Sequence, residues 1–238
     1  MPLQSDLRVK IFADGANEEA ILSLATNPVI KGFTTNPTLM RSAGVTDYEA
    51  FARRVLDRLT ELPISFEVFA DEFDEMERQA REIASWGENV YVKIPVTNTQ
   101  RVSSAPLIEK LAGDGIRLNV TAVLTLDQVR TVSARLAGGP SSIISVFAGR
   151  IADTGCDPVP LMCQALEIMA PHSNQELLWA SPRELLNIVQ ADAIGCHVIT
   201  VTPDLLKKLA LLGRDLADYS LDTVRMFHGD AQAAGFRL

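Results

Sequence analysis

Short apolar runs alternate with longer helical patterns along the whole 238-residue chain, and this alternation restricts the possible fold more than any other feature. Eight runs have the composition of buried strands, and their starts lie about 20 to 35 residues apart, which is the size of one βα unit. The predicted strands are Val9–Ala13, Gly32–Thr35, Ile64–Val68, Val90–Pro95, Leu118–Ala122, Ile143–Phe147, Leu177–Ala180 and Val198–Val201.

The segments between these runs carry apolar residues at three- and four-residue spacing, as amphipathic helices do. The predicted helices are Ala16–Ala25, Tyr48–Leu59, Glu72–Trp86, Ser103–Ala112, Leu126–Ala137, Val159–Met169, Pro182–Val189 and Pro203–Leu212. Strong helix-start signals open four of them. These signals are Asp47, Thr125, Ser181 with Pro182, and Thr202 with Pro203.

Eight βα units in a chain of this length predict an α/β fold, a single (β/α)8 TIM barrel that spans residues 1–238. An open doubly wound sheet is the alternative, but it usually has fewer strands, and no GxGxxG motif follows the first strand here. Residues 214–238 are a further helical tail, which we expect to pack on the barrel or on a neighbouring subunit. No linker or internal repeat divides the chain.

Charge and composition exclude several classes of protein. The formal net charge is −8, from 22 Lys and Arg against 30 Asp and Glu. We therefore expect no broad surface that binds nucleic acid or anionic lipid, although this charge is compatible with a local cationic pocket. Without a run of about 18 apolar residues or a secretory signal, the sequence predicts a soluble cytoplasmic protein with no membrane span. The three cysteines and three histidines lack ligand spacing, so neither a disulfide framework nor a metal site is expected.

Polar side chains gather at the C-terminal ends of the predicted strands, where the inner layers of a barrel are normally Val, Ile or Leu. Burying one polar group without a partner costs roughly 1–3 kcal/mol, so many such groups at one rim indicate a shared use. Enzymes with this fold place their active sites at that rim. The polar residues there include Asp14, Thr34, Asn36, Glu67, Lys93, Asn119, Thr121, Ser145, Arg150, Ser181, Arg183 and Thr200.

Lys93 interrupts the apolar strand Val90–Pro95. Desolvation disfavours a buried ammonium group, so a lysine in such a strand can serve as an amine nucleophile and form a Schiff base with a carbonyl substrate. The alternative is a lysine that is paired with a carboxylate or reaches the surface. Lys10 stands in a similar run but lies early in its strand, toward the opposite end of the barrel.

Two carboxylates and two arginines complete this candidate set. Asp14 and Glu67 suit proton transfer. The structural alternatives are a helix cap for Asp14 and an inward ion pair for Glu67. Arg150 and Arg183 follow neighbouring strands, with Ser181 at a predicted helix start, and this combination suits a phosphate dianion. Two surface arginines are the alternative.

Five short motifs resemble those of the transaldolase family, class I aldolases with a (β/α)8 fold. They stand in the family's order, and the resemblance extends over nearly the whole chain. The motifs are Gly32-Phe33-Thr34-Thr35-Asn36-Pro37, Tyr91-Val92-Lys93-Ile94-Pro95, Asn119-Val120-Thr121, Ser145-Val146-Phe147-Ala148-Gly149-Arg150-Ile151 and Ala180-Ser181-Pro182-Arg183. The short chain is similar to the compact branch of the family, which also includes fructose-6-phosphate aldolases.

The resemblance implies a role for each matching position. Lys93 matches the Schiff-base lysine, and Asp14 matches the acid/base that acts on the substrate hydroxyl during C–C cleavage. Glu67 and Thr121 match the pair that holds a catalytic water. The positions that match the dihydroxyacetone-binding and pocket residues are Asn36, Asn119, Ser145 and Phe147, with Thr34 beside them. The positions that match the phosphate site are Arg150, Ser181 and Arg183.

Two positions distinguish the branches of this family. Glu67 and Phe147 are similar to the transaldolase branch, whereas the aldolase branch typically carries glutamine and tyrosine there. Pro182 departs from the family pattern, in which an aromatic residue is commoner, and this leaves the acceptor sugar open. By resemblance to short transaldolases, we expect a homo-oligomer, either a ring of five subunits or a pair of such rings.

The resemblance therefore implies a transaldolase of the pentose phosphate pathway. Such an enzyme transfers a dihydroxyacetone unit from fructose 6-phosphate or sedoheptulose 7-phosphate to an aldose phosphate, and it needs no metal or cofactor because the lysine supplies the electron sink. Three alternatives stay open: an aldolase that releases free dihydroxyacetone, a specialised transaldolase that builds longer sugar phosphates, and an inactive sugar-phosphate-binding protein.

Overall fold

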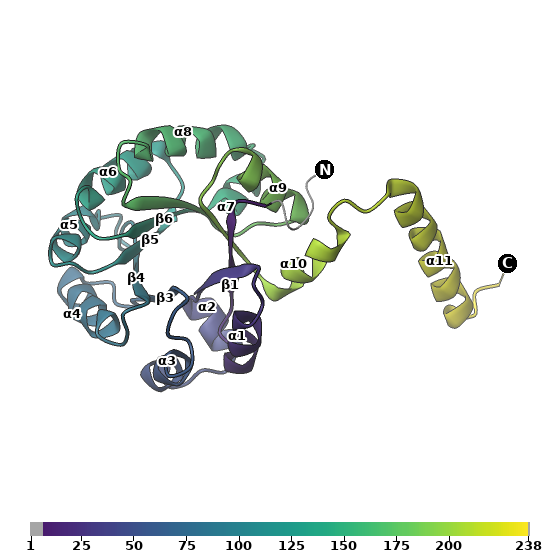
Figure 1. Cartoon of the computed structure of the whole chain (residues 1–238), viewed down its shortest axis with the longest axis horizontal. Coiled ribbons are helices and arrows are strands. Elements are labelled where there is room, and N and C mark those ends of the chain that lie inside the picture. Colours follow the sequence, from purple (N-terminus) through teal and green to yellow (C-terminus); the bar gives the residue numbers. More distant parts are fainter. Residues whose placement is uncertain (1–6, 238) are drawn as a thin grey trace.

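The computed structural model of the chain describes residues 7–237 and confirms the predicted (β/α)8 barrel (Figure 1). Eight parallel strands pair in sequence order, and β8 closes the barrel by pairing with β1. The strands are β1 Lys10–Asp14, β2 Ile30–Thr34, β3 Ile64–Glu67, β4 Val90–Pro95, β5 Leu118–Val123, β6 Ser142–Val146, β7 Gln175–Trp179 and β8 Val198–Val201.

Helices follow each strand and form the outer layer of the barrel (Figure 1). They are α1 Glu18–Ala25, α2 Pro37–Ser42, α3 Tyr48–Leu56, α4 Phe73–Ala84, α5 Ala105–Gly113, α6 Leu126–Leu136, α7 Ala148–Ala152, α8 Val159–Met169, α9 Leu185–Ala193, α10 Pro203–Lys207 and α11 Leu216–Ala234. Three predicted start signals are confirmed, because Asp47, Thr125 and Thr202 are the N-cap residues of α3, α6 and α10. The Asp47 and Thr125 side chains accept backbone N–H groups of the first turn, which leaves fewer unpaired donors at the helix start.

The sequence did not predict two short helices, α2 and α7. They have six and five residues, which is too few to show a helical period. The signal for α2 is its cap, since the Asn36 side chain accepts the N–H of Leu39 and Pro37 occupies the first helical position. Both helices lie directly after the ends of strands, so they shape the rim at which the polar residues gather.

The expected helix start at Ser181 and Pro182 is wrong, because α9 begins at Leu185. Ser181 has a φ of 57°, in the left-handed region, and the chain turns there instead of entering a helix. The Asn187 side chain accepts the N–H groups of residues 183 and 184, and these two donors lie before the first turn of α9. Ser181 is therefore part of a turn and not of a helix N-terminus.

Strand β4 shows how the alternation of side chains builds the site. Val92 and Ile94 belong to the large core between the strands and the helices, whereas Tyr91 belongs to a smaller apolar cluster inside the barrel. Lys93 stands two residues after Tyr91, and side chains in a strand have a period of two, so it shares the interior face nearer the C-terminal end. The same two-residue spacing relates Asp14 to Phe12, Ser145 to Ile143 and Thr200 to Val198, and each of these three apolar residues belongs to the interior cluster.

Gly32 shows how tightly the barrel interior is filled. A Cβ atom at this position would lie 2.6 Å from the ring of Phe12, which is closer than carbon atoms pack. The aromatic ring of β1 therefore occupies the space that a side chain on β2 would need. The apolar interior ends below the polar rim and supports it from beneath.

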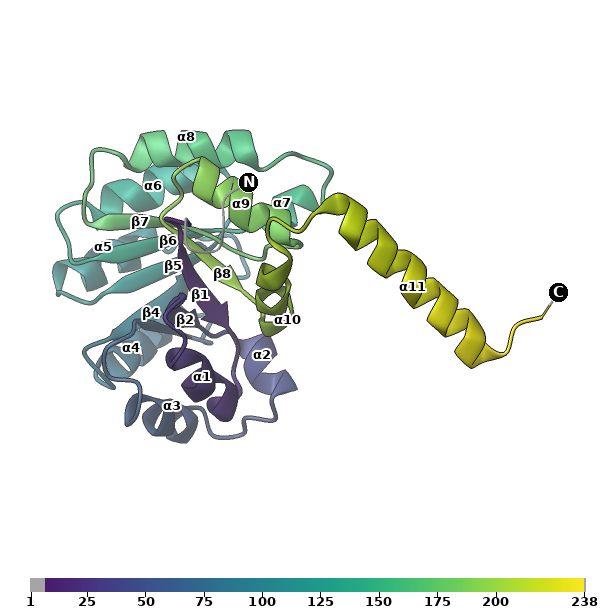
Figure 2. The same cartoon turned by 45° about the vertical axis from the view of Figure 1, so that its right-hand side comes forward.

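The C-terminal helix α11 extends away from the barrel in both views (Figures 1 and 2). None of its residues is buried, and Leu216, Tyr219 and Phe227 are 77, 46 and 63% exposed. These three side chains share one face, because 3.6 residues make one helical turn. In this structure α11 does not bury any residue against the barrel, and packing of the tail on a neighbouring subunit stays a prediction.

Within residues 7–237, no helix combines the length and the apolar character needed to cross a membrane.

Candidate active site

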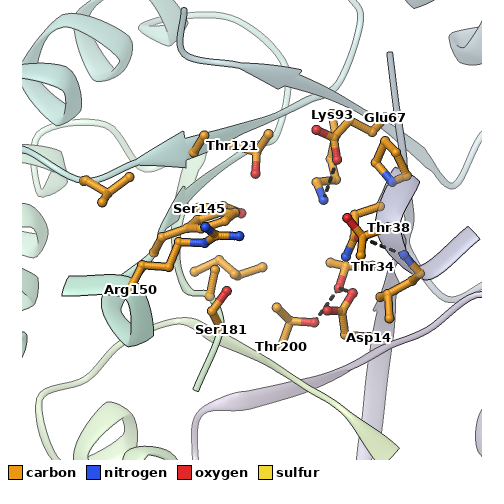
Figure 3. A pocket seen from close by; sticks show the side chains of 18 residues that line it. Asp14, Thr34, Thr38, Glu67, Lys93, Thr121, Ser145, Arg150, Ser181 and Thr200 are labelled. Carbon is orange, nitrogen blue, oxygen red and sulfur yellow. Dashed lines mark hydrogen bonds and ion pairs between the residues drawn. The ribbon is translucent and has the colours of Figure 1, made fainter. Parts of the chain in front are cut away.

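A cavity of about 620 Å³ opens at the C-terminal ends of the strands (Figure 3). Its volume lies within the range of small-molecule sites, which is about 300–1,000 Å³. The structure brings together ten of the twelve predicted site residues in its wall, and these are Asp14, Thr34, Asn36, Glu67, Lys93, Thr121, Ser145, Phe147, Arg150 and Ser181. Asn119 and Arg183 do not line it.

Lys93 is buried and carries its amine into this cavity (Figure 3). The Nζ atom lies 3.1 Å from Oε2 of Glu67 and donates a 2.7 Å hydrogen bond to the backbone carbonyl of Thr35. Lys93 and Glu67 are register partners on β4 and β3, so strand pairing sets the two side chains next to each other. The ion-pair alternatives considered separately for Lys93 and Glu67 thus describe one contact, and that contact faces the cavity.

Tyr48, the first residue of α3, holds the backbone of Glu67. Its Oη atom donates to the carbonyl of Glu67 at 2.9 Å and accepts the N–H of the same residue at 2.8 Å. Burial raises the pKa of Tyr48 above its usual value, so the hydroxyl keeps the proton that the first of these bonds requires. The sequence analysis missed Tyr48, because it looked for site residues at strand ends and Tyr48 opens a helix.

Asp14 lies at the end of β1 and does not cap α1. Asn17 does this instead, since its side chain accepts the N–H of Ala20. The Thr34 hydroxyl, from the register partner on β2, donates a 2.9 Å hydrogen bond to Oδ1 of Asp14. Burial raises the pKa of Asp14 above its ordinary value, and the positive charge of Lys93 and the Thr34 hydrogen bond offset part of this effect. A carboxylate held this way is a stronger base than one in water.

Strand β5 is irregular next to Thr121, which lines the cavity. The register with β6 shifts between Val120 and Val123, and Ala122 has a φ of 60°. A non-glycine residue in this conformation costs of order 1–3 kcal/mol, and such strain is typical of functional sites. Both strained residues of the rim, Ala122 and Ser181, line the cavity.

Asn119 lies beneath the cavity rather than in its wall. It is fully buried, its Nδ2 donates to Oγ of Ser65 at 3.0 Å, and its Oδ1 accepts from Oγ of Ser145 at 2.6 Å. The amide therefore bridges strands β3, β5 and β6. Through this bridge it orients Ser145, which does line the cavity.

Arg150 and Ser181 lie across the cavity from Lys93 (Figure 3). The Arg150 guanidinium stands over the ring of Phe147, with its carbon 5.5 Å from the ring centroid. A Cβ atom at Gly149 would lie only 1.5 Å from the carbonyl oxygen of Ser181. Gly149 therefore allows α7 and the turn after β7 to touch, and this contact brings Arg150 and Ser181 to the same wall.

The second predicted phosphate arginine, Arg183, does not line the cavity. Its guanidinium donates two hydrogen bonds to the Asp153 carboxylate, one from Nε at 3.0 Å and one from Nη2. The side chain is half exposed, and the pair holds the pKa of Asp153 below its usual value. Arg150 thus lines the cavity, whereas Arg183 occupies the surface position that was its alternative.

Other ionisable groups lie apart from this cavity. Lys10 pairs with Glu176 at 2.6 Å and is half exposed at the N-terminal end of β1. Across the part of the chain that the structure describes, no three His, Cys, Asp or Glu side chains cluster closely enough to hold a metal ion. The cavity itself offers an amine, carboxylates, hydroxyls and one guanidinium, a set that suits a phosphorylated carbonyl compound.

Known proteins with similar sequences carry related names. The family model described as transaldolase/fructose-6-phosphate aldolase matches residues 11–238. A protein of Dehalococcoides mccartyi named "probable transaldolase" is 35% identical over 194 residues, which cover 81% of this chain and 86% of the relative. A protein of Streptococcus pyogenes with the same name is 35% identical over 202 residues, with 84% and 90% covered.

Solved structures support the barrel fold at low sequence identity. The 3-keto-L-gulonate-6-phosphate decarboxylase of Vibrio cholerae superposes with a TM-score of 0.53 at 12% identity, over 82% of this chain and 88% of that protein. This likeness concerns the fold alone. The family match covers nearly the whole chain, including every residue of the cavity wall and all strand residues except Lys10. On this basis, the chain belongs to the transaldolase/fructose-6-phosphate aldolase family.

Proposed function

We propose that this protein is a transaldolase that carries a dihydroxyacetone unit on Lys93, from a ketose phosphate such as fructose 6-phosphate or sedoheptulose 7-phosphate to an aldose phosphate. The observation that carries the proposal is the buried amine of Lys93, which enters a cavity between two carboxylates and opposite an arginine. A structural lysine would need only the Glu67 partner. The cavity beside it, lined by hydroxyl groups, supports a chemical role for the amine.

The first step is formation of the Schiff base. Glu67, 3.1 Å from the Lys93 nitrogen, accepts a proton, and the free amine adds to the ketose carbonyl carbon. The carbonyl oxygen takes up the proton that the newly bonded nitrogen loses, and it becomes the hydroxyl of a carbinolamine. Glu67 then returns a proton to this hydroxyl, which leaves as water beside Thr121 while the C=N bond forms.

The second step breaks the C3–C4 bond of the sugar. Asp14 takes the proton of the C4 hydroxyl, and C4 becomes the aldehyde carbon of the departing aldose phosphate. The electron pair of the broken bond moves to C3 and into the iminium group, which gives an enamine on Lys93. An acceptor aldehyde then enters, the enamine carbon attacks it, and Asp14 returns the proton to the new hydroxyl.

Arg150 and Ser181 are assigned to the phosphate group in this proposal. A guanidinium matches the geometry of a phosphate and forms charge-assisted hydrogen bonds with it. Their place across the cavity from Lys93 suits a substrate whose phosphate lies at the far end from its carbonyl group (Figure 3). Ser145, oriented by Asn119, is placed to bind a hydroxyl of the dihydroxyacetone unit.

A trapping experiment tests the covalent step. Borohydride added with fructose 6-phosphate is expected to fix a three-carbon adduct on Lys93, read by peptide mass spectrometry. Lys10 is the internal control, because it is exposed at the other end of the barrel. An adduct on Lys10, or on no lysine, would contradict the assignment.

A turnover assay distinguishes transfer from release. Fructose 6-phosphate is supplied with and without erythrose 4-phosphate, and aldose phosphate and free dihydroxyacetone are both measured. We expect product only when the acceptor is present. Product without acceptor would identify an aldolase, and no product at all would indicate a binding protein or a transaldolase for longer sugar phosphates.

We also propose that the exposed apolar face of α11 packs on a neighbouring copy, in a ring of five subunits or a pair of such rings. Large contiguous apolar surfaces are unusual on monomers, and α11 has no partner within its own barrel. Light scattering is expected to give a mass several times 25.9 kDa. Phe227→Asp is expected to lower this mass, whereas Gln232→Asp on the opposite face of α11 is not. A monomer mass for the unmodified protein would contradict the proposal.

A further inference from the structure

Three side chains from neighbouring strands form a chain of hydrogen bonds at one side of the cavity (Figure 3). Thr200 on β8 and Thr34 on β2 join through their hydroxyl oxygens, and Thr34 in turn reaches Asp14 on β1, which lies between them in the sheet. Both threonines are buried, with 6 and 3% of their surface exposed. Thr200 also lines the cavity.

The direction of the hydrogen bonds follows from counting protons. A hydroxyl group has one hydrogen to donate and lone pairs with which to accept. Thr34 donates its hydrogen to Oδ1 of Asp14, so in its contact with Thr200 the Thr34 oxygen accepts. Thr200 is then the donor. Without it, the Thr34 hydroxyl could rotate toward other acceptors, and Asp14 would have a less constant partner.

Thr200 is the one polar residue of β8. The other residues of the strand, Val198, Ile199 and Val201, are apolar and buried. A valine at position 200 would have almost the same shape as threonine and would suit a strand equally well. Packing therefore does not account for the hydroxyl, whereas the contact with Thr34 does.

We propose that Thr200 is a positioning residue for Asp14, which acts through Thr34 in the cleavage and formation of the C–C bond. The inference rests on the proposed function and extends it to a residue outside the motifs that carried the family resemblance. Thr200 orients Thr34, and Thr34 holds the Asp14 carboxylate toward the C4 hydroxyl of the bound sugar.

The chain of hydroxyl groups can hold Asp14 in both of its protonation states during the reaction. While Asp14 is ionised, hydrogen bonds run from Thr200 to Thr34 and from Thr34 to the carboxylate. After Asp14 has taken the C4 hydroxyl proton on its other carboxyl oxygen, Thr34 still donates to Oδ1 and Thr200 still donates to Thr34, so the proton stays on the side of the sugar. No heavy atom has to move, so the same network serves bond cleavage and the reverse addition.

The test separates the two chemical steps in the Thr200→Val variant. Schiff-base formation depends on Lys93 and Glu67, which Thr200 does not contact, whereas cleavage depends on Asp14. With fructose 6-phosphate and borohydride, the unmodified protein is expected to show mainly the three-carbon adduct on Lys93. The variant is expected to accumulate the uncleaved six-carbon phosphorylated adduct. Its kcat should fall roughly 3- to 10-fold, as expected for the loss of one neutral hydrogen bond, with little change in KM.

Three further variants keep the test specific. Thr202→Val is the matched control, because Thr202 is exposed two residues further on and its side chain makes no capping hydrogen bond. It should leave the ratio of the two adducts unchanged. Thr200→Ser keeps the hydroxyl and should restore most of the cleavage rate. Thr200→Ala removes the hydroxyl in a second way if the valine variant does not fold.

The outcomes distinguish this inference from the function on which it rests. If the unmodified protein forms no adduct on Lys93, the proposed function fails, and the role of Thr200 fails with it. If the unmodified protein reacts as expected but the valine and alanine variants keep its ratio of adducts, only the inference about Thr200 is overturned. Equal slowing of adduct formation and cleavage would also overturn it, because a merely structural residue would affect both.

Discussion

Replacing Arg150 by alanine tests which of the two predicted arginines binds the substrate phosphate. Arg150 lines the cavity over Phe147, whereas Arg183 is half exposed and paired with Asp153. In the structure, only Arg150 is therefore free to meet a ligand in the cavity. Arg183→Ala is the matched control, because it removes the same group from the neighbouring turn.

The size of the effect follows from the type of contact. A hydrogen bond to a charged group contributes about 1.5–3 kcal/mol, and about 1.4 kcal/mol corresponds to a factor of ten in affinity. Arg150→Ala is thus expected to raise KM for fructose 6-phosphate roughly 10- to 100-fold. Arg150→Lys keeps the charge but loses the planar fork of donors, so its KM should lie between that of the unmodified protein and that of Arg150→Ala. Arg183→Ala should change KM little.

The assay compares phosphorylated with unphosphorylated sugars. The Arg150→Ala variant and the control are each measured with fructose 6-phosphate and with fructose, and the ratio of kcat/KM values isolates the contribution of the phosphate. We expect Arg150→Ala to lower this ratio and Arg183→Ala to preserve it. An equal loss for both sugars, or a larger loss in the Arg183 variant, would refute the reasoning.

Three further predictions concern Glu67 with Phe147, Tyr48 and Asp14. Glu67→Gln together with Phe147→Tyr is expected to lower transfer to erythrose 4-phosphate and to raise release of dihydroxyacetone, because an amide cannot accept the proton that a carboxylate can; an unchanged product ratio would contradict this. Tyr48→Phe leaves the N–H and carbonyl of Glu67 without their partner, so urea denaturation should show a loss of about 1–3 kcal/mol in stability, together with a lower kcat. Burial, together with the negative charge of Glu67, raises the pKa of Asp14, while Lys93 and Thr34 lower it. The folded state therefore binds the Asp14 proton more tightly than the unfolded state, and stability falls as pH rises from the ordinary value of 3.8 through the raised one. Asp14→Asn should accordingly raise the melting temperature at neutral pH, and a scan toward pH 3.8 should show this gain disappear.

Much of the candidate site could be predicted because its signal is local in the sequence. Strand β4 alone displays a lysine among apolar residues, two positions after the inward Tyr91, and a period of two is enough to point both side chains into the barrel. The same argument placed Asp14, Glu67 and Ser145 at the rim before any contact was known. Ten of the twelve predicted residues line one cavity.

The features that the sequence did not predict depend on contacts between segments that are distant along the chain. Arg183 follows a strand end as Arg150 does, yet Asp153, 30 residues earlier, holds it outside the cavity. The sequence pattern around Ser181 is typical of a helix start, but the backbone turns there in the left-handed region, and Gly149 of α7 contacts that turn. Tyr48 carried no signal at all, because its partner is the backbone of Glu67 rather than a side chain that a motif would show.

The sequence by itself determined the eight βα units and the rim at which the chemistry gathers, since apolar periodicity and residue type are properties of short windows. Only the tertiary structure decided which rim residues meet. Thr34 and Thr200 stand 166 residues apart, and their hydroxyls touch because β8 closes the barrel against β1 beside β2. Closure and strand register are collective results of packing the whole chain, and no window of sequence contains them.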